Sequence, residues 1–405
     1  MKRILITVIL CFFGMTVFAQ DMSYYLSDFM RDDGSIEDRL LILEAVRDAG
    51  LTGIGEFYHN ALKYLYVRIP DVKTKTDEDA VERSAVILCQ GLGAEKYTDA
   101  AHEIWYTADY FDIERDPANQ GNAMQAALIA LGQVNGKEYL PNIIQRLNQY
   151  NMQTLRDEAR SRVQMAVVGY INAIEAFKDI SGYMPVFYVY TGSYDTDVQQ
   201  IAYNALPNIS DDPAEVTIIL IEEPTNNPYV KLEAWKELLR SKASDSSKAK
   251  VALTAIAASW NYATNNKSYL ATLGVMRKSA IDTIRQYGAA DSIAYEYMDR
   301  AYLESFNNNE PDFEEIILTL DALSALKSDE AVALLVKYLR EIHDRRRHGL
   351  WGERERRIFQ WLISCLEYTE TKSIDAKLLL STIQRTSAYT PFEQGLAKNA
   401  LAKLN

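Results

Sequence analysis

The stretch from Asp197 to Ile209 reads DVQQIAYNALPNI. Its apolar residues recur alternately every three positions and every one position, a spacing that places them on one stripe of an α-helix. We expect this stripe to be buried and the intervening polar residues to face solvent. The residues of the predicted buried stripe are Val198, Ile201, Ala202, Ala205, Leu206 and Ile209.

The same stripe recurs along the chain at a regular interval. The last segment, FEQGLAKNALAKL, repeats it with Leu396, Ala397, Ala400, Leu401 and Leu404. The interval averages about 40 residues, which is typical of repeats built from two helices. The sequence therefore predicts about nine to ten copies of one unit. The segments begin near residues 36, 80, 122, 159, 197, 229, 269, 313, 355 and 392.

A second type of helical segment lies between these copies. Its clearest examples are GEFYHNALKYL, GKEYLPNIIQRL, SDEAVALLVKYL and SIDAKLLLSTI, and each follows a short polar or glycine-containing turn. Every unit is therefore expected to form a helix, a turn and a second helix. The nearest candidate for a strand is VFYVY at 186–190, but its helical surroundings favour a helix. The sequence predicts an all-α fold.

Several helix starts carry recognisable capping signals. Thr390-Pro391-Phe392-Glu393 is a capping box with proline at the first helical position, and Asp212-Pro213-Ala214-Glu215 is a close variant. Asn227-Pro228 and Glu310-Pro311 place proline at two further predicted starts. These signals agree with the spacing of the repeats.

With these residues the chain resembles the HEAT-repeat family of armadillo-like helical proteins, whose second helix carries the pattern D-V-R-x-x-A-x-x-A-L-x-x-I. Six residues between Asp197 and Ile209 match this pattern, but Gln199 stands where the family prefers arginine. Val230-Lys231 is closer to the family's basic form, so the repeats are divergent. The matching residues are Asp197, Val198, Ala202, Ala205, Leu206 and Ile209.

The resemblance covers residues 35–405 and implies a right-handed superhelical α-solenoid in which each repeat contacts only its neighbours. It also implies that the second helices line the concave side. There they would expose a mixed polar surface better suited to a protein partner than to a lipid or an RNA backbone. The residues expected on that surface are Gln199, Tyr203, Lys231, Lys236, Gln394 and Lys398.

The first 19 residues have the features of a secretory signal peptide. Lys2 and Arg3 precede an apolar run over 4–18, and Ala19 supplies a small residue at the cleavage point. The apolar run is shorter than the roughly 20 residues that a transmembrane helix needs, which disfavours a retained anchor. We expect a protein exported to the periplasm or the cell exterior of a bacterium, with residues 20–34 as an N-terminal capping segment and no transmembrane segment after cleavage.

The three cysteines are too few for a disulfide scaffold. Cys11 lies in the signal-like segment, but Leu10 precedes it where a lipoprotein signal carries a small residue. Cys89 and Cys365 occupy positions in apolar helical runs where other repeats carry alanine. We expect both to be small buried residues without a chemical role.

Composition narrows the classes of function. The chain has 405 residues, of which 48% are apolar and 24% charged, so it can form a large core. Its net charge of −13 argues against a nucleic-acid binder, and acidic residues are most in excess over 21–116. His59, His102, His343 and His348 do not have metal-ligand spacing. We expect no metal and no cofactor, and Asp195-Thr196-Asp197 to be a helix cap and not a calcium loop.

The segment 341–357, EIHDRRRHGLWGERERR, is the strongest candidate binding site. It joins six arginines to Trp351 in a predicted turn between two helices, and Arg and Trp are residue types favoured at interface hot spots. Acidic neighbours such as Glu353 and Glu355 could neutralise part of this charge. We expect an acidic protein or anionic envelope component to dock there. The candidate residues are Arg345, Arg346, Arg347, Trp351, Arg354, Arg356 and Arg357.

These observations favour an exported, non-enzymatic binding or scaffold protein. Two alternatives stay open. One is a secreted all-α toroid enzyme that acts on polysaccharide through paired carboxylates, with some of the 26 tyrosines as sugar platforms. The other is a structural protein of the cell envelope.

Overall fold

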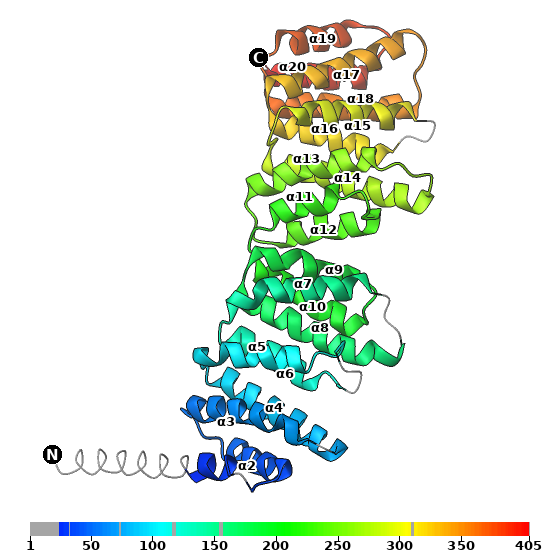
Figure 1. Cartoon of the computed structure of the whole chain (residues 1–405). Coiled ribbons are helices and arrows are strands. Elements are labelled where there is room, and N and C mark those ends of the chain that lie inside the picture. Colours follow the sequence, from blue (N-terminus) through cyan, green and yellow to red (C-terminus); the bar gives the residue numbers. More distant parts are fainter. Residues whose placement is uncertain are drawn as a thin grey trace, which may run out of the picture. The chain divides into compact units, whose positions relative to one another are not determined.

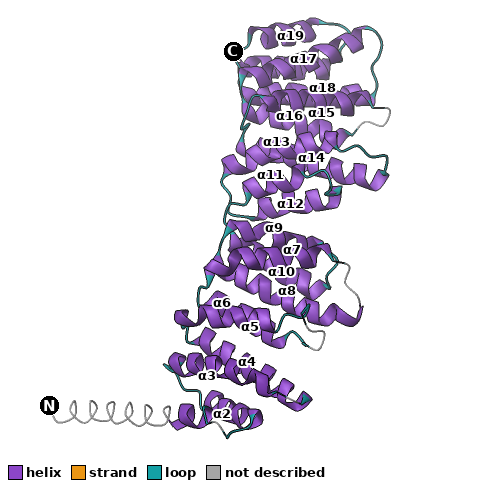
Figure 2. Ribbon diagram, in the orientation of Figure 1, coloured by secondary structure: helices purple, strands orange, loops and turns teal. Residues whose placement is uncertain are grey.

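The fold is all-α (Figures 1 and 2), as the sequence predicts. The computed structural model describes residues 24–31, 33–72, 74–115, 119–153, 157–308 and 312–404, and no β-strand occurs among them. Contacts divide the chain into two compact units, Met1–Asp211 and Asp212–Asn405. The single repeat domain expected over 35–405 therefore stays a prediction.

In unit 1, helices pair along the chain and the pairs stack in two layers. The even-numbered second helices pack consecutively, α2 on α4, α4 on α6, α6 on α8 and α8 on α10. The odd-numbered first helices pack on their own partners, and α3 also packs on α5 and α7 on α9. The second helices are α2 (Ile36–Asp48), α4 (Lys75–Ala94), α6 (Asn122–Gln133), α8 (Asp157–Phe177) and α10 (Thr196–Ile209). The first helices are α3 (Gly55–Arg68), α5 (Ala101–Tyr110), α7 (Leu140–Met152) and α9 (Tyr183–Thr191).

Unit 2 repeats this arrangement. The second helices stack in chain order from α12 to α20, and the first helices stack in chain order from α11 to α19. Each first helix also packs on the second helix that follows it. The second helices are α12 (Pro228–Arg240), α14 (Lys267–Tyr287), α16 (Phe313–Leu326), α18 (Glu353–Thr369) and α20 (Pro391–Leu404). The first helices are α11 (Ala214–Glu222), α13 (Asp245–Asn261), α15 (Ile293–Asn307), α17 (Asp329–Arg347) and α19 (Ile374–Arg385).

The predicted phasing of the helices is confirmed. Each of the ten predicted stripe segments falls on an even-numbered helix from α2 to α20. Helix α4 begins five residues before its predicted start, and the other nine begin within two residues of theirs. The segment 186–190 lies within α9 and is helical, as expected. Hydrophobic periodicity alone therefore placed the second helices.

The buried stripe of α10 is confirmed with one correction. Val198, Ala202 and Leu206 are buried, but Ile201 is 36% exposed. Ile201 lies at the edge of the stripe, next to the buried Ala202. Gln199 is half-buried and donates a hydrogen bond to the Gly192 carbonyl at 2.7 Å, so its side chain is committed to the preceding turn.

Lys231 is a second correction, because it is buried and not on the exposed surface predicted for it. Only 3% of its surface is accessible. Its ammonium group donates hydrogen bonds to the carbonyl oxygens of Ile221 and Glu223 at the end of α11. The chain around 222–226 folds over the lysine, and helix periodicity does not predict the path of such a loop.

The capping predictions hold at two helix starts. Thr390 and Glu393 form the predicted reciprocal pair, with Thr390 N donating to Glu393 at 2.8 Å and Glu393 N to Thr390 at 3.3 Å. Asn227 caps α12 by accepting from two backbone N–H groups. The Asp212 variant is only partial, because Pro213 is the N-cap, and Asp212 accepts from the backbone N–H of Ala214 and from the Ser247 hydroxyl. Glu310-Pro311 lies outside the described residues.

Asp195 is also a partial case. It occupies the N-cap position of α10, but its carboxylate makes no cap hydrogen bond and instead pairs with Arg160 at 2.7 Å. Asp195 therefore occupies the predicted cap position, but its side chain does not make the hydrogen bond that defines a cap.

The described N-terminal residues pack on α2 through one buried arginine. Arg39 is almost fully buried and donates hydrogen bonds to the carbonyl oxygens of Phe29, Arg31 and Gly34. The predicted signal peptide, 1–19, lies outside the described residues. Over the part of the chain that is described, no helix has the length and apolarity that spanning a membrane requires.

Candidate binding surface on the second helices of unit 2

The Arg-rich segment 341–357 forms the end of α17, a turn and the start of α18, as predicted. Trp351 lies in this turn and is half-buried, with its ring packed edge-on against Phe359 and Tyr389. Arg346 stacks over Trp351 at 4.4 Å from the ring centroid and donates two hydrogen bonds to the Ala388 carbonyl, at 2.6 and 2.9 Å. These contacts fasten the turn to the loop that precedes α20.

Two further arginines surround a buried carboxylate. Glu355 is only 5% exposed and accepts hydrogen bonds from the backbone N–H of Gly352 at 3.0 Å and from Arg345 and Arg354 at 2.9 Å each. Burial alone raises the pKa of the Glu355 carboxyl, but these hydrogen bonds outweigh burial and hold the pKa at about 2. The predicted neutralisation by acidic neighbours is therefore realised at Glu355.

Arg345, Arg346, Trp351 and Arg354 therefore make contacts that hold the turn within the fold. Glu355 satisfies the Gly352 N–H at the start of α18, Arg345 and Arg354 hold that carboxylate, and Arg346 satisfies the Ala388 carbonyl. The other three arginines are exposed. Arg356 lies 3.7 Å from Glu353 and 3.8 Å from Glu393, Arg357 lies over the Phe313 ring, and Arg347 is at the end of α17. For all seven candidate residues, a binding role stays a prediction.

Arg357 begins an exposed row of side chains on α18. Arg357, Trp361, Ser364 and Tyr368 are four, three and four positions apart, so they share one face of the helix. We call this row the α18 stripe. Trp361 is 41% exposed and Tyr368 is 59% exposed, which is high for residues that usually bury most of their rings.

The α18 stripe borders a pocket shared with α14 and α16. Its volume is about 480 Å³, and Trp361 and Tyr368 line it together with Arg285, Asp321 and Cys365. The Trp361 indole N–H donates to Asp321 at 2.7 Å, which holds the exposed ring in place. Lys327 lies over the Tyr368 ring at 4.5 Å. Both aromatic side chains are therefore held in place before any partner binds.

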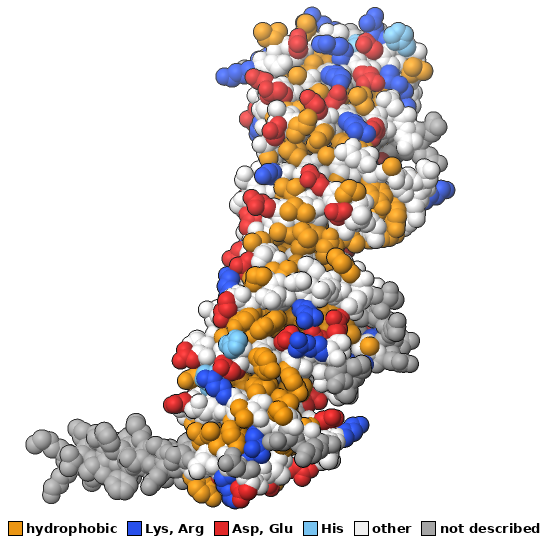
Figure 3. All heavy atoms as spheres, viewed as in Figure 1, with side chains coloured by type: hydrophobic (Ala, Val, Ile, Leu, Met, Phe, Trp, Pro, Cys, Tyr) orange, Lys and Arg blue, Asp and Glu red, His pale blue; other side chains and the backbone are white. Residues whose placement is uncertain are grey.

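Charge on this surface is mostly paired, but two cations are not. Lys278 pairs with Asp312 and Glu314, and Arg285 pairs with Asp282 at 2.7 Å. Among the described residues, Lys327 and Arg357 form no ion pair with a carboxylate, and their printed contacts are with aromatic rings. The region around the α18 stripe therefore has two cations without a carboxylate partner beside exposed aromatic rings, and its pocket also contains Asp321, which accepts from Trp361. Figure 3 shows one face of the chain, on which charged side chains are frequent near α17–α20.

Of the α18 stripe, the sequence analysis had selected only Arg357. The sequence does contain a signal for Trp361 and Tyr368. The apolar stripe of the same helix contains the buried Ile358, Leu362 and Leu366, and the two aromatic residues lie on the face opposite this stripe. An aromatic residue on the polar face of an amphipathic helix is a departure from the repeat pattern.

The described residues hold no group of three or more His, Cys, Asp or Glu side chains that could bind a metal ion. His59 is buried against Glu103 at 3.0 Å, and His343 is buried against the Tyr389 hydroxyl at 3.0 Å. Cys89 and Cys365 are free and buried, and burial raises the pKa of each thiol to about 12, which disfavours a reactive thiolate. These side chains belong to the packing of the helices.

Comparison with known proteins adds no relative. No family model matches the chain, and no curated protein matches it.

Proposed function

We propose that this protein is an exported binding scaffold whose α18 stripe docks an acidic segment of a partner protein. One observation carries the proposal: two exposed, positioned aromatic rings lie beside two cations that have no carboxylate partner. Tryptophan, tyrosine and arginine are the residue types that contribute most to protein–protein affinity. Unpaired cations around them favour an acidic partner and speed its association at low salt.

The layered helix pairs support this function. Stacked second helices provide a rigid face on which side chains from successive repeats are held at fixed spacing, and such faces are the binding surfaces of helical repeat proteins. We take the chain to be a divergent α-solenoid of HEAT-like repeats, on the residues of α10 that match that family's pattern. No bond is made or broken in this mechanism, because the surface acts by complementarity alone.

The test is site-specific photocrosslinking in the native cell envelope. A photoreactive residue at Ser364, in the middle of the α18 stripe, should crosslink to a protein partner, and one at Leu378, which is exposed on the first helix α19, should not. Trp361→Ala with Tyr368→Ala should remove the crosslink, whereas Ile374→Ala, an exposed apolar residue of α19, should leave it intact. Crosslinking of equal strength at both positions contradicts the proposal.

The acidic character of the partner is tested separately. Arg357→Glu should weaken the Ser364 crosslink, and raising the salt concentration should weaken it in the wild type, since exposed charge interactions are screened within about 8 Å at physiological ionic strength. A crosslink that survives both changes would show an apolar partner instead.

Export is tested on native material. If the first 19 residues are a cleaved signal peptide, N-terminal analysis of the protein from cells should begin at Gln20. Recovery of the protein with Met1 and the following residues retained would contradict export by this route.

A further inference from the structure

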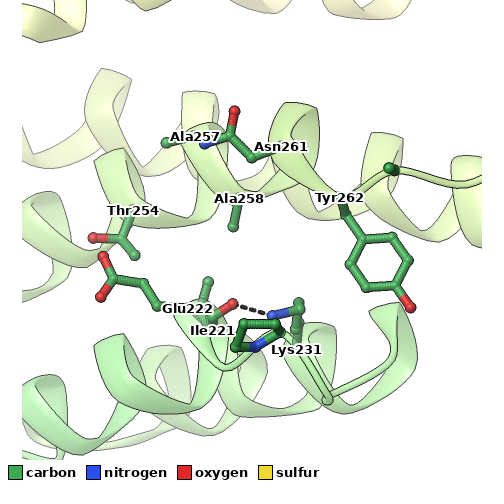
Figure 4. Close-up of a pocket in the computed structure, with 10 residues that line it drawn as sticks. Ile221, Glu222, Lys231, Thr254, Ala257, Ala258, Asn261 and Tyr262 are labelled. Atoms are coloured by element: carbon green, nitrogen blue, oxygen red, sulfur yellow. Dashed lines mark hydrogen bonds between the residues drawn. The ribbon is translucent and has the colours of Figure 1, made fainter.

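A second pocket of unit 2 contains a buried cation with no anionic partner. The pocket lies between the end of α11, the start of α12 and the end of α13, and its volume is about 480 Å³ (Figure 4). Volumes of about 300–1,000 Å³ are typical of sites for small ligands. We call it the Lys231 pocket. It is separate from the α18 stripe, and no residue lines both.

Lys231 projects into this pocket from the first turns of α12. Its ammonium group has three N–H donors. One donates to the Ile221 carbonyl and one to the Glu223 carbonyl, the latter at 2.6 Å (Figure 4 shows the first). One donor is left for a ligand, and the fold already holds the group in position.

The charge of Lys231 is not neutralised within the described structure. Lys231 forms no ion pair with a carboxylate there, and the Glu223 carboxylate is turned away to accept from the hydroxyl and N–H of Thr225, at 2.7 and 3.1 Å. A lysine of which only 3% is exposed, and whose ammonium group has no ion-pair partner among the described residues, is costly to keep charged. Desolvation accordingly lowers the pKa of Lys231, although Glu223 and Glu222 oppose the shift from a distance.

The remaining walls are mostly apolar, although Glu222 also lines the pocket, and Figure 4 shows its carboxylate beside Thr254. Ile221, Pro224, Ala257 and Ala258 supply apolar surface, and the Tyr262 ring lies 6.0 Å from the ammonium nitrogen. Figure 4 shows the α13 side chains across the slot from Lys231, with Thr254 and Asn261 offering a hydroxyl and an amide. On the face drawn in Figure 3, hydrophobic side chains gather over the α11–α14 part of unit 2.

Two alanines on α13 are important for the size of the Lys231 pocket. Ala257 and Ala258 are only partly buried although they face the pocket, so their methyl groups leave space that larger side chains would fill. The Lys231 pocket thus combines one positioned ammonium group, an aromatic ring and an apolar surface. This combination is typical of small-ligand sites.

We propose that the Lys231 pocket binds a small carboxylate, with its anionic group on the Lys231 ammonium and its aliphatic body against Ala257, Ala258 and Pro224. The bound carboxylate supplies the counter-charge that the fold lacks. Two sources share this chemistry: a free short-chain acid and the C-terminal carboxylate of a peptide. Binding should fail at high pH, because Lys231, whose pKa is lowered, loses its charge earlier than an exposed lysine does.

The experiment is calorimetric titration of the full-length mature protein with N-acetyl-L-alanine, its amide, and acetylated tri-alanine with a free C-terminus. The acid should bind and the amide should bind at least about tenfold more weakly, a difference that one lost charge interaction produces. Tighter binding of the tripeptide than of the single residue identifies a peptide C-terminus, and the reverse order identifies a free acid. Equal binding of acid and amide, or no binding of either acid at millimolar concentration, overturns the proposal.

Variants distinguish the pocket from other basic sites. Lys231→Met should abolish binding, while Lys236→Met, an exposed lysine on the same helix that pairs with Glu233, should not change it. Because Lys231→Met also removes two hydrogen bonds to α11 and could impair folding, Ala258→Leu provides a second variant that fills the slot and leaves Lys231 in place. Wild-type binding by a folded Ala258→Leu protein overturns the assignment of the site.

Discussion

The Arg-rich turn between α17 and α18 and the α18 stripe lie within about thirty residues of one another, and both combine arginine with tryptophan. In the turn, Arg346 and Trp351 contact each other, and Arg346 also donates to the Ala388 carbonyl, so they hold the fold. On the stripe, Arg357 and Trp361 face outward and are exposed. Arginine and tryptophan therefore stabilise the fold in the turn, whereas on the α18 stripe they are exposed on the surface.

The difference follows from where each set lies on its helix. Helix ends leave backbone N–H and C=O groups without partners, and long polar side chains near the ends are recruited to satisfy them or to join the flanking loops. The middle of a helix satisfies its own backbone, so a side chain on its outer face has no such task. Functional candidates in a helical repeat are therefore better sought at mid-helix positions than in dense polar turns.

The largest effect should separate two adjacent residues of α18. Leu362 is fully buried, and Leu362→Ala should lower the free energy of unfolding by about 3 kcal/mol through lost burial and the cavity that remains. Trp361→Ala should cost less than about 1 kcal/mol, because the ring is exposed and loses one hydrogen bond to Asp321. Urea unfolding measures both, and equal costs would show that Trp361 belongs to the core.

The turn makes the next prediction. Glu355→Ala removes the acceptor shared by Arg345 and Arg354, and we expect a loss of about 2 kcal/mol, less than for a fully buried pair because both arginines are partly exposed. Glu353→Ala is the matched control, since Glu353 is exposed near Arg356 and should cost under about 0.5 kcal/mol. A small loss of unfolding free energy for Glu355→Ala would show that these contacts do not stabilise the turn and that its charges are only solvated.

The same carboxylate gives a pH dependence of known sign. The pKa of Glu355 is lowered in the folded state to about 2, from an ordinary value of 4.5. Its contribution to stability is therefore complete above about pH 4.5 and is lost as the pH falls toward 2. The difference in unfolding free energy between wild type and Glu355→Ala should shrink over that range, and a constant difference would contradict the low pKa.

Sequence periodicity predicted the second helices because each must bury a stripe between two neighbours, and that requirement repeats in every unit. Leu206 and Ala202 are buried as predicted, since they lie at the centre of the stripe. Ile201 at its edge is not, because burial there depends on how closely the next helix approaches. Periodicity specifies the centre of a buried face better than its margins.

The candidate site was less predictable for a different reason. Lys231 was predicted to be exposed, but it shares the buried face of α12 with Ala234 and Trp235, and the end of α11 offers its ammonium group two carbonyl acceptors. Glu355 was recognised as a neutraliser, yet its depth depends on three donors that come from both helices and the turn. Such contacts depend on loop paths, which no repeating pattern encodes.

Neighbouring arginines of α17 give a smaller effect. Arg346→Ala should lower stability by about 1 kcal/mol, because it loses two hydrogen bonds to Ala388 and its stacking on Trp351. Arg347→Ala should change stability by less than about 0.5 kcal/mol, since Arg347 is exposed. Thermal unfolding of the two variants compares them directly, and the reverse order would contradict the assignment of Arg346 to the fold.

The smallest expected effect is a gain in stability, and it tests how far the binding surface extends beyond the α18 stripe. Gly274 lies inside α14 at a helical φ, and a Cβ added there would meet no atom within 4 Å. Gly274→Ala should therefore raise the free energy of unfolding by about 0.5–1 kcal/mol, as alanine does in an exposed helix interior.

A glycine that the fold does not need is informative when it lies on a proposed docking face. If the partner also covers α14, the added methyl group should weaken the Ser364 crosslink while the protein becomes more stable, so stability and binding change in opposite directions. If the crosslink is unchanged, the contact ends at the pocket formed by Arg285, Asp321 and Trp361. A loss of stability in Gly274→Ala would instead show that the surface of α14 is covered in the folded protein itself.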